Sequence, residues 1–209
     1  LLKFETMPQD CTTANLYDSL RFCDGNVVIP GIRRRVYYIP KSNIVSYPIL
    51  PDVDADGASM GSIATYVGNF IPAANSKFKY IDIDDASSNV DSESQGEMYS
   101  RTFLNKATFK HPGKAEEATG FARMANNSDL LFLYQERSGK FRVLGNDKFT
   151  TNVKPAQNSG AKETDASGTT LSIEVSDVCP APFYTGDIPL DSGVLNTSTS
   201  EITREATTS

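Results

Sequence analysis

The chain has 209 residues, a hydrophobic share of 39% and a formal net charge of −6. This length predicts one domain with a substantial core and some remainder for arms. An acidic protein lacks the basic face that grips nucleic acid, although repulsion can help nucleic acid to pass without sticking. The longest apolar run, about residues 130–134, is far shorter than the roughly 20 residues that a membrane helix needs, so we expect no membrane partner.

The residue types that support common enzyme chemistry are sparse. His111 is the only histidine, and Cys11, Cys23 and Cys179 form no CxxC pair. A Ser-His-Asp triad needs a histidine base and zinc needs clustered His and Cys, so both are disfavoured. Paired carboxylates suit glycoside hydrolysis, but the chain has no tryptophan to stack a sugar ring. We therefore expect no enzymatic activity, no cofactor and free thiols.

The first 84 residues predict an arm followed by short strands. Residues 1–25 are mixed in character and predict an N-terminal arm. Residues 33–39, RRRVYYI, predict a strand, because β-branched and aromatic residues follow the arginines. Prolines then predict an extended, irregular stretch at 40–61. Further strands are predicted at residues 62–71 and 77–84.

The clearest pattern in the chain is a period-2 alternation over residues 97–111, which predicts one long strand. The acidic, serine-rich residues 84–97 before it predict an exposed loop. The predicted strand is far longer than the usual five or six residues, so we expect it to take part in assembly. Tyr99, Phe103, Ala107 and Phe109 lie on one side of the predicted strand, and Met98, Ser100, Thr102, Lys106 and Thr108 lie on the other.

The remainder of the chain predicts one helix, a hairpin and a last strand pair. Residues 114–125 carry alanines and Phe121 at helical spacing, with acidic residues in the first turn. Ser138-Gly139 predicts a tight turn between strands at 129–137 and 140–144. The last pair is predicted at residues 148–153 and 169–175, and the polar residues 191–209 predict a flexible or partner-ordered tail.

These elements predict a mainly β fold, a β-sandwich or partial barrel with one flanking α-helix. The predicted domain spans residues 26–190, between the N-terminal arm at 1–25 and the polar C-terminal tail at 191–209.

Two charged motifs have both a functional and a structural interpretation. Asp52, Asp54 and Asp56 open a D-x-D-x-D-G sequence, in which alternating carboxylates can wrap a calcium ion. Position 12 of such a loop is Ile63 rather than a bidentate glutamate, so a polar turn is favoured over a metal site. The arginines at 33–35 are interpreted as edge charges or intersubunit ion pairs rather than as phosphate contacts.

Six short stretches of the chain together resemble the sequence of a known family. They are 35–40 (RVYYIP), 95–97 (QGE), 117–122 (EATGFA), 126–133 (NNSDLLFL), 142–146 (RVLGN) and 180–186 (PAPFYTG). Together they resemble tail-tube-like structural proteins encoded by phages and prophages of Bacteroidetes-type bacteria. The likeness covers about residues 26–190 and consists of structural rather than catalytic motifs.

The resemblance implies a structural subunit that assembles as stacked, hexameric rings. In such tubes each subunit gives a few long strands to a continuous inner barrel, and arms and one extended loop link successive rings. Double-stranded DNA passes through the lumen without specific binding, and acidic residues there would repel its phosphates. By position, the strand at 96–111 suits the inner wall and the stretch 40–61 suits the inter-ring loop.

The inner-wall candidates are therefore Ser100, Thr102, Lys106 and Thr108, and the packing candidates are Phe103, Phe109 and Phe121. The implied partners are further copies of the chain and other phage tail proteins. The implied location is the phage virion, after assembly in the host bacterial cytoplasm.

Two other functions are compatible with the same elements. A tail terminator or capsid decoration protein would form a single closed ring or a trimer rather than a polymer. A secreted ligand-binding β-sandwich would use the Asp52–Gly57 stretch to bind carbohydrate or calcium.

Overall fold

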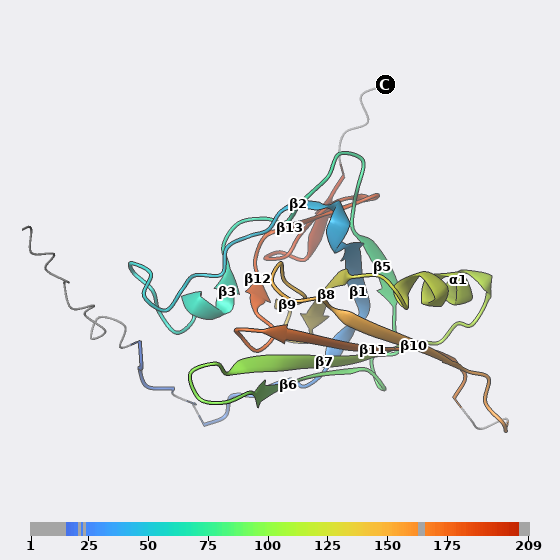
Figure 1. The fold of residues 1–209 in the computed structure, drawn as a ribbon, viewed down its shortest axis with the longest axis horizontal. Helices are drawn as coiled ribbons and strands as arrows, with labels where there is room; N and C mark the ends of the chain where they lie inside the picture. The colour runs from blue at the N-terminus through green and yellow to red at the C-terminus, as the bar shows by residue number, and fades with distance from the viewer. Residues whose placement is uncertain (1–15, 21, 23, 163–165, 205–209) are drawn as a thin grey trace, which may run out of the picture.

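The structure, a computed structural model, describes residues 16–20, 22, 24–162 and 166–204. The chain is mainly β, with 44% in strands and 9% in helices. The described residues contain one α-helix and several sheets, none of which closes into a barrel (Figure 1). The predicted class, a mainly β, sandwich-like fold with one flanking helix, is confirmed.

A six-stranded sheet forms the central layer of the fold. Its strands, in spatial order, are β3 (Thr65–Tyr66), β12 (Phe183–Tyr184), β9 (Phe141–Leu144), β8 (Leu130–Glu136), β1 (Ile32–Pro40) and β5 (Lys79–Asp82). β8 reads LLFLYQE, and every residue except Glu136 is buried. Because neighbouring side chains of a strand point to opposite faces, a strand buried throughout requires cover on both faces of its sheet.

One face of the central sheet packs against a four-stranded antiparallel sheet. In spatial order its strands are β10 (Asn152–Asn158), β11 (Gly168–Asp177), β7 (Thr102–His111) and β6 (Asn89–Gln95). The ring of Phe109 lies between the two sheets, 6.2 Å from the ring of Phe132 and 6.5 Å from that of Tyr134. These contacts belong to one apolar cluster, to which β11 adds Leu171, Ile173 and Val175.

The helix α1 (Glu116–Ala125) lies along β10 and β11 at one end of this interface. Glu116 and Glu117 occupy its first turn, where negative charge is favourable, and Arg123 lies in its last turn. Phe121 packs edge-on against Tyr38 of β1, with ring centroids 5.1 Å apart. The helix therefore seals the end of the sandwich, as the alanine-rich side at 114–125 predicts.

The other face of the central sheet is covered by residues 44–78 and by a small three-stranded sheet. Phe70 is only 2% exposed and meets Tyr184 and Phe78 at ring separations of 5.1 and 6.3 Å. The covering elements are β2 (Ile44–Ser46), β4 (Ile71–Pro72), β13 (Asp187–Leu190), β14 (Gly193–Asn196), β15 (Glu201–Thr203) and the 3-10 turns Lys41–Asn43 and Ser62–Ala64.

The predicted long strand at 97–111 is wrong in its first third. β7 begins at Thr102, and residues 96–101 form the turn that joins β6 to β7. The predicted loop at 84–97 therefore contains the strand β6. Val90 is its only apolar residue, and it packs against the core, while alternate polar residues face solvent. Pairing with β7 defines this strand, and its sequence has too little apolar character to indicate it.

The predicted flexible tail from Asp191 is also wrong over residues 193–203. These residues form β14 and β15, and Leu195 is only 3% exposed within the second apolar cluster. The predicted domain end at 190 thus falls at the turn between β13 and β14. The segment contains one buried leucine among polar residues. Its sequence therefore lacks the apolar pattern by which a strand is predicted.

Smaller differences concern the predicted strand limits. Residues 62–71 form a 3-10 turn and two strands of two residues instead of one strand. The last strand pair begins at Asn152 rather than at 148, because side chains hold the preceding backbone in a loop. Asn146 Oδ1 accepts hydrogen bonds from the N–H groups of residues 148 and 149 at 3.0 and 2.8 Å, and Asp129 Oδ1 accepts one from Thr151.

The described part of the predicted arm contains no helix or strand. Residues 16–20, 22 and 24–31 run along the outside of the fold and away from it (Figure 1). Residues 1–15, 21 and 23 of the predicted arm lie outside the described residues, as do Cys11 and Cys23.

Candidate functional site

The acidic and sulfur-containing side chains of the described residues do not gather into a metal site. No group of three or more His, Cys, Asp or Glu is placed to hold an ion there. Asp52, Asp54 and Asp56 are exposed in successive turns, where the N–H of Ala55 donates to the Asp52 carbonyl oxygen at 3.2 Å. Gly57 has a φ of +71°, which the turn requires. These three carboxylates therefore lie on a turn-rich loop without converging.

The histidine and the described cysteine both have structural surroundings. His111 Nδ1 lies 2.7 Å from the carbonyl oxygen of Asp82 and fastens the end of β7 to β5. Because a carbonyl oxygen only accepts, Nδ1 is the protonated nitrogen of the neutral ring. Cys179 is a buried free thiol, and burial together with the charge of Asp177 raises its pKa to about 11. A thiol in this state is a poor nucleophile at neutral pH.

The four-stranded sheet has a distinctive outer face, which points away from the core. The strand registers place one set of cross-strand partners on this face, and all of them are exposed or half-buried. Only Leu104 and Ala156 among them are apolar. The outer face consists of Asn89, Asp91, Glu93 and Gln95 of β6, Thr102, Leu104, Lys106, Thr108 and Lys110 of β7, Thr170, Ser172, Glu174 and Ser176 of β11, and Asn152, Lys154, Ala156 and Asn158 of β10.

Charges on the outer face cancel. Lys106 of β7 pairs with Glu93 of β6, and Lys154 of β10 lies 3.3 Å from Glu174 of β11. The hydrogen bond that Lys106 donates to the Glu93 carboxylate raises the pKa of Lys106. With Asp91 and Lys110, the face holds three acidic and three basic residues, so its net charge is zero. A polar, charge-balanced face offers hydrogen-bonding groups to water but attracts neither anions nor cations strongly.

Both edges of this sheet are open in the described residues. β6 and β10 each pair with one strand, so each has an edge whose backbone groups meet no strand partner. Exposed edges invite pairing with another chain unless they are blocked. Pro155 removes one donor from β10, which limits but does not abolish its capacity to pair. The sheet is therefore able to extend sideways by adding a strand at either edge.

The outer face contains three of the four inner-wall candidates. Thr102, Lys106 and Thr108 project from it, whereas Ser100 lies in the β6–β7 turn, where its N–H donates to the Glu97 carbonyl oxygen at 3.1 Å. Sequence reasoning missed the β6, β10 and β11 residues of this face. The alternation of Asn89, Asp91, Glu93 and Gln95 with Val90 was a signal for β6, but a weak one.

The three packing candidates lie in different surroundings. Phe109 is 0% exposed in the cluster between the sheets, and Phe121 packs against that cluster from α1. Phe103 is half-buried and belongs to neither apolar cluster; its cross-strand neighbours are Ser94 and Asp177.

Exposed apolar side chains are concentrated in two other places. The segment before β1 carries Tyr17, Leu20, Phe22, Val27, Val28 and Ile29, which are 54–93% exposed. The ribbon of β2 and β4 carries Val45, Ile49, Val67 and Ile71, which are 54–72% exposed. Ile49 and Val67 face each other through two backbone hydrogen bonds of 3.0 and 2.8 Å. Val45 and Ile49 of this ribbon lie within the stretch 40–61 that the resemblance assigned to the inter-ring loop.

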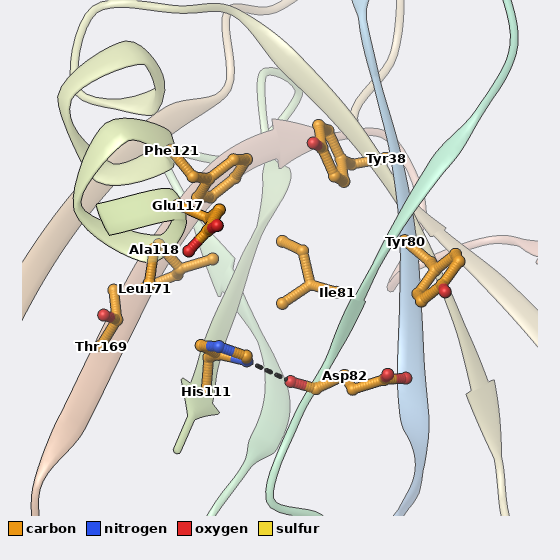
Figure 2. A pocket seen from close by; sticks show the side chains of 10 residues that line it. All are labelled: Tyr38, Tyr80, Ile81, Asp82, His111, Glu117, Ala118, Phe121, Thr169 and Leu171. Atoms are coloured by element: carbon orange, nitrogen blue, oxygen red, sulfur yellow. Dashed lines mark hydrogen bonds between the residues drawn. The ribbon is translucent and has the colours of Figure 1, made fainter. Parts of the chain in front are cut away.

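A pocket of about 320 Å³ opens between α1, β5 and the ends of β7 and β11 (Figure 2). Its walls are mostly apolar, and Glu117 and His111 add polar atoms. Its lining residues are Tyr38, Tyr80, Ile81, Asp82, His111, Glu117, Ala118, Phe121, Thr169 and Leu171.

Comparison with known proteins gives no match. No protein-family model, no curated protein and no solved structure is significantly similar to this chain. No described helix is long and apolar enough to cross a membrane.

Proposed function

We propose that this protein is a structural subunit of a phage tail tube, which forms rings that stack into a conduit for DNA. One observation carries the proposal: a four-stranded sheet packs on the core with one face, is polar at all but two positions of the other, and is open at both edges. A sheet with this construction suits a wall between a protein core and a water-filled channel. Closing such sheets around a ring would remove their exposed edges.

The strand directions support closure of such a ring. β10, β11, β7 and β6 alternate in direction, so β6 runs antiparallel to β10. When a rotated second copy places its β10 beside β6, the new pair is also antiparallel. An even number of alternating strands therefore extends around a ring without a break in the pattern.

The charges of the two edges favour head-to-tail association. On the outer face β6 carries Asp91 and Glu93, whereas the charged residue of β10 is Lys154. Pairing β6 with a second β6 would oppose like charges, and pairing it with β10 brings opposite charges together. Association between unlike edges is heterologous, and heterologous contacts generate rings or filaments.

The proposed lumen differs in charge from the acidic lining expected from the sequence. The outer face has no net charge, and Lys106 and Lys154 are each held by a carboxylate. Phosphate groups would meet neutralised lysines there, which supports passage of double-stranded DNA without specific binding. In this proposal the partners are further copies and other tail proteins, in a virion assembled in the host bacterial cytoplasm.

Electron microscopy of the purified protein tests the proposal directly. Tubes or stacked rings with a central channel are the expected result. Discrete closed rings or trimers at high concentration would favour a tail terminator or capsid decoration protein instead. A protein that stays monomeric at every concentration contradicts all of these functions.

A charge swap tests the edge pairing. Asp91→Lys should raise the concentration needed for assembly severalfold, because it opposes Lys154 of the next copy. Thr170→Lys is the control, since it places the same lysine side chain on the same face but on the interior strand β11. Asp91→Lys combined with Lys154→Glu should regain assembly. Equal effects of both lysine substitutions would contradict pairing between β6 and β10.

A further inference from the structure

The turn between β6 and β7 presents an aromatic side chain in an unusual way. Tyr99 is 97% exposed, and its φ of +72° lies in the left-handed region that non-glycine residues rarely adopt. The N–H and hydroxyl of Ser100 both donate to the Glu97 carbonyl oxygen, at 3.1 and 3.2 Å, which holds the turn in this form. Met98 beside it is 66% exposed. A strained backbone that displays an aromatic ring to solvent suggests a binding role.

The pocket under α1 has the dimensions and lining to receive such a ring. Its volume of about 320 Å³ is at the lower end of the range for small-molecule sites and exceeds the size of one phenol side chain. Figure 2 shows Phe121, Tyr38 and Ile81 around its interior, with Glu117 on the helix side and His111 below. Aromatic walls favour an aromatic occupant, because offset and edge-to-face ring contacts add to the burial of apolar area.

The polar atoms at the pocket complement a phenol hydroxyl. His111 uses Nδ1 for the Asp82 carbonyl oxygen, which leaves Nε2 with a lone pair. Within the described residues, no hydrogen bond or ion pair engages the Glu117 carboxylate. Both groups accept hydrogen bonds, and a tyrosine hydroxyl is a donor.

The turn and the pocket lie at opposite ends of the same strand. β7 starts directly after the turn at Thr102 and ends at His111, which lines the pocket. Ten residues of antiparallel strand span roughly 30 Å. Figure 1 shows the β6–β7 turn at one end of the four-stranded sheet and α1 at the other end. Tyr99 therefore cannot reach the pocket of its own chain, but the pocket of a second copy placed end to end is accessible to it.

We infer that Tyr99 of one copy enters the pocket under α1 of a second copy, so that copies join end to end along the strand direction. This inference rests on the proposed tube and names the contact between its rings. Because the turn and the pocket are different surfaces, each copy retains one free turn and one free pocket after joining. The contact is thus heterologous and continues without limit, and it aligns the outer sheet faces of successive copies along one channel.

Site-specific cross-linking tests the contact. The photoreactive residue p-benzoylphenylalanine replaces Tyr99, assembled protein is irradiated, and cross-linked peptides are identified by mass spectrometry. The expected partner peptide is residues 115–125 or the neighbouring β5. Cross-links to the N-terminal arm or to the β2–β4 ribbon, or none, would overturn the inference and leave ring closure through β6 and β10 intact.

Two complementary variants test the direction of joining. Tyr99→Ala removes the inserted side chain, and Ala118→Trp fills the pocket from the helix. Each alone should raise the concentration needed for stacking by about tenfold or more, as expected for a central aromatic anchor. A mixture of the two should form pairs of rings and no longer stacks, because only one productive junction exists between them. Met98→Ala is the control, since it shortens another exposed side chain of the same turn, one that is 66% exposed.

The outcomes separate this contact from the proposed function. Tubes that form equally well with Tyr99→Ala would overturn the contact but not the tube. Rings that form but never stack in the unmodified protein also overturn it and favour a tail terminator. A strictly monomeric protein overturns both.

Discussion

The central sheet and the four-stranded sheet differ in how much of each is buried within the subunit. β8 at the middle of the central sheet is buried at six of its seven positions. β7 at the middle of the four-stranded sheet is buried only at Asn105, Ala107 and Phe109, on alternate positions. Both sheets have open edges, but the first is covered on both faces within one chain, whereas the second has a free polar face. The first therefore stabilises the subunit, and the second is available for assembly.

The largest expected contrast between the two sheets is in stability. Phe132→Ala in β8 removes a ring that is 0% exposed and touches Tyr38 and Phe109, so it should lower the free energy of unfolding by roughly 3–5 kcal/mol. Ser172→Ala on the outer face of β11 should change it by less than about 0.5 kcal/mol. Urea denaturation of dilute, unassembled protein measures both. Comparable losses would show that the outer face contributes to the subunit core.

Substitutions at the junction between the two sheets should cause the next largest loss of stability. Asn105 of β7 is 0% exposed, and its side chain reaches residues that lead into β12 of the central sheet. Its Nδ2 donates to the Cys179 carbonyl oxygen at 3.2 Å, and its Oδ1 accepts from the Ala181 N–H at 3.0 Å and the Ser92 hydroxyl at 2.6 Å.

Asn105→Ala leaves these buried groups without partners, so it should cost on the order of 2–3 kcal/mol in the same urea assay. Gln95→Ala is the control, because Gln95 also links strands of this sheet by side-chain hydrogen bonds but lies at its half-buried end. A loss as small as that of the control would show that the junction is held by apolar contacts alone.

The smallest of the three expected effects on stability comes from Asp177 and depends on pH. Asp177 at the end of β11 is 3% exposed, and its Oδ2 has no hydrogen-bond partner in the described part of the chain. Burial raises the pKa of Asp177 above its ordinary value of 3.8. As pH rises from 3.8 through the raised pKa, the unfolded chain loses this proton before the folded chain does. The folded state therefore loses stability across that window.

Asp177→Asn removes this titration, so its stability advantage over the unmodified protein should appear as pH rises from 3.8 and be largest at neutral pH. Urea denaturation at a series of pH values measures the difference. Parallel profiles for the two proteins would show that Asp177 is better solvated than its burial indicates.

The sequence predicted the elements whose apolar pattern is strong. β1, β8, β9 and α1 were placed correctly. Large apolar residues mark the three strands, and alanines with Phe121 at helical spacing mark α1. The tight turn at Ser138-Gly139 was also correct. β6 was missed because Val90 is its only apolar residue. β14 and β15 were missed because one inward leucine, Leu195, anchors a polar segment.

The candidate site was predicted only in part, for a related reason. Thr102, Lys106 and Thr108 were assigned to an exposed strand face from their alternation with Phe103, Ala107 and Phe109. Their neighbours on β10 and β11 come from residues about 45–70 positions later in the chain, and no local pattern connects them. The pairing of Lys106 with Glu93 likewise depends on the register between β6 and β7.

The sequence alone determined the fold class, the strongest strands and the single helix, because apolar periodicity is a local property of the chain. Only the tertiary structure decided that β6 is a strand, that the C-terminal residues fold back, and that one sheet keeps a polar face and two free edges. These features depend on which strands pair and in what register. Strand pairing is formed by backbone hydrogen bonds between segments that are distant in the sequence. In polar strands, the side chains do not indicate which segments pair.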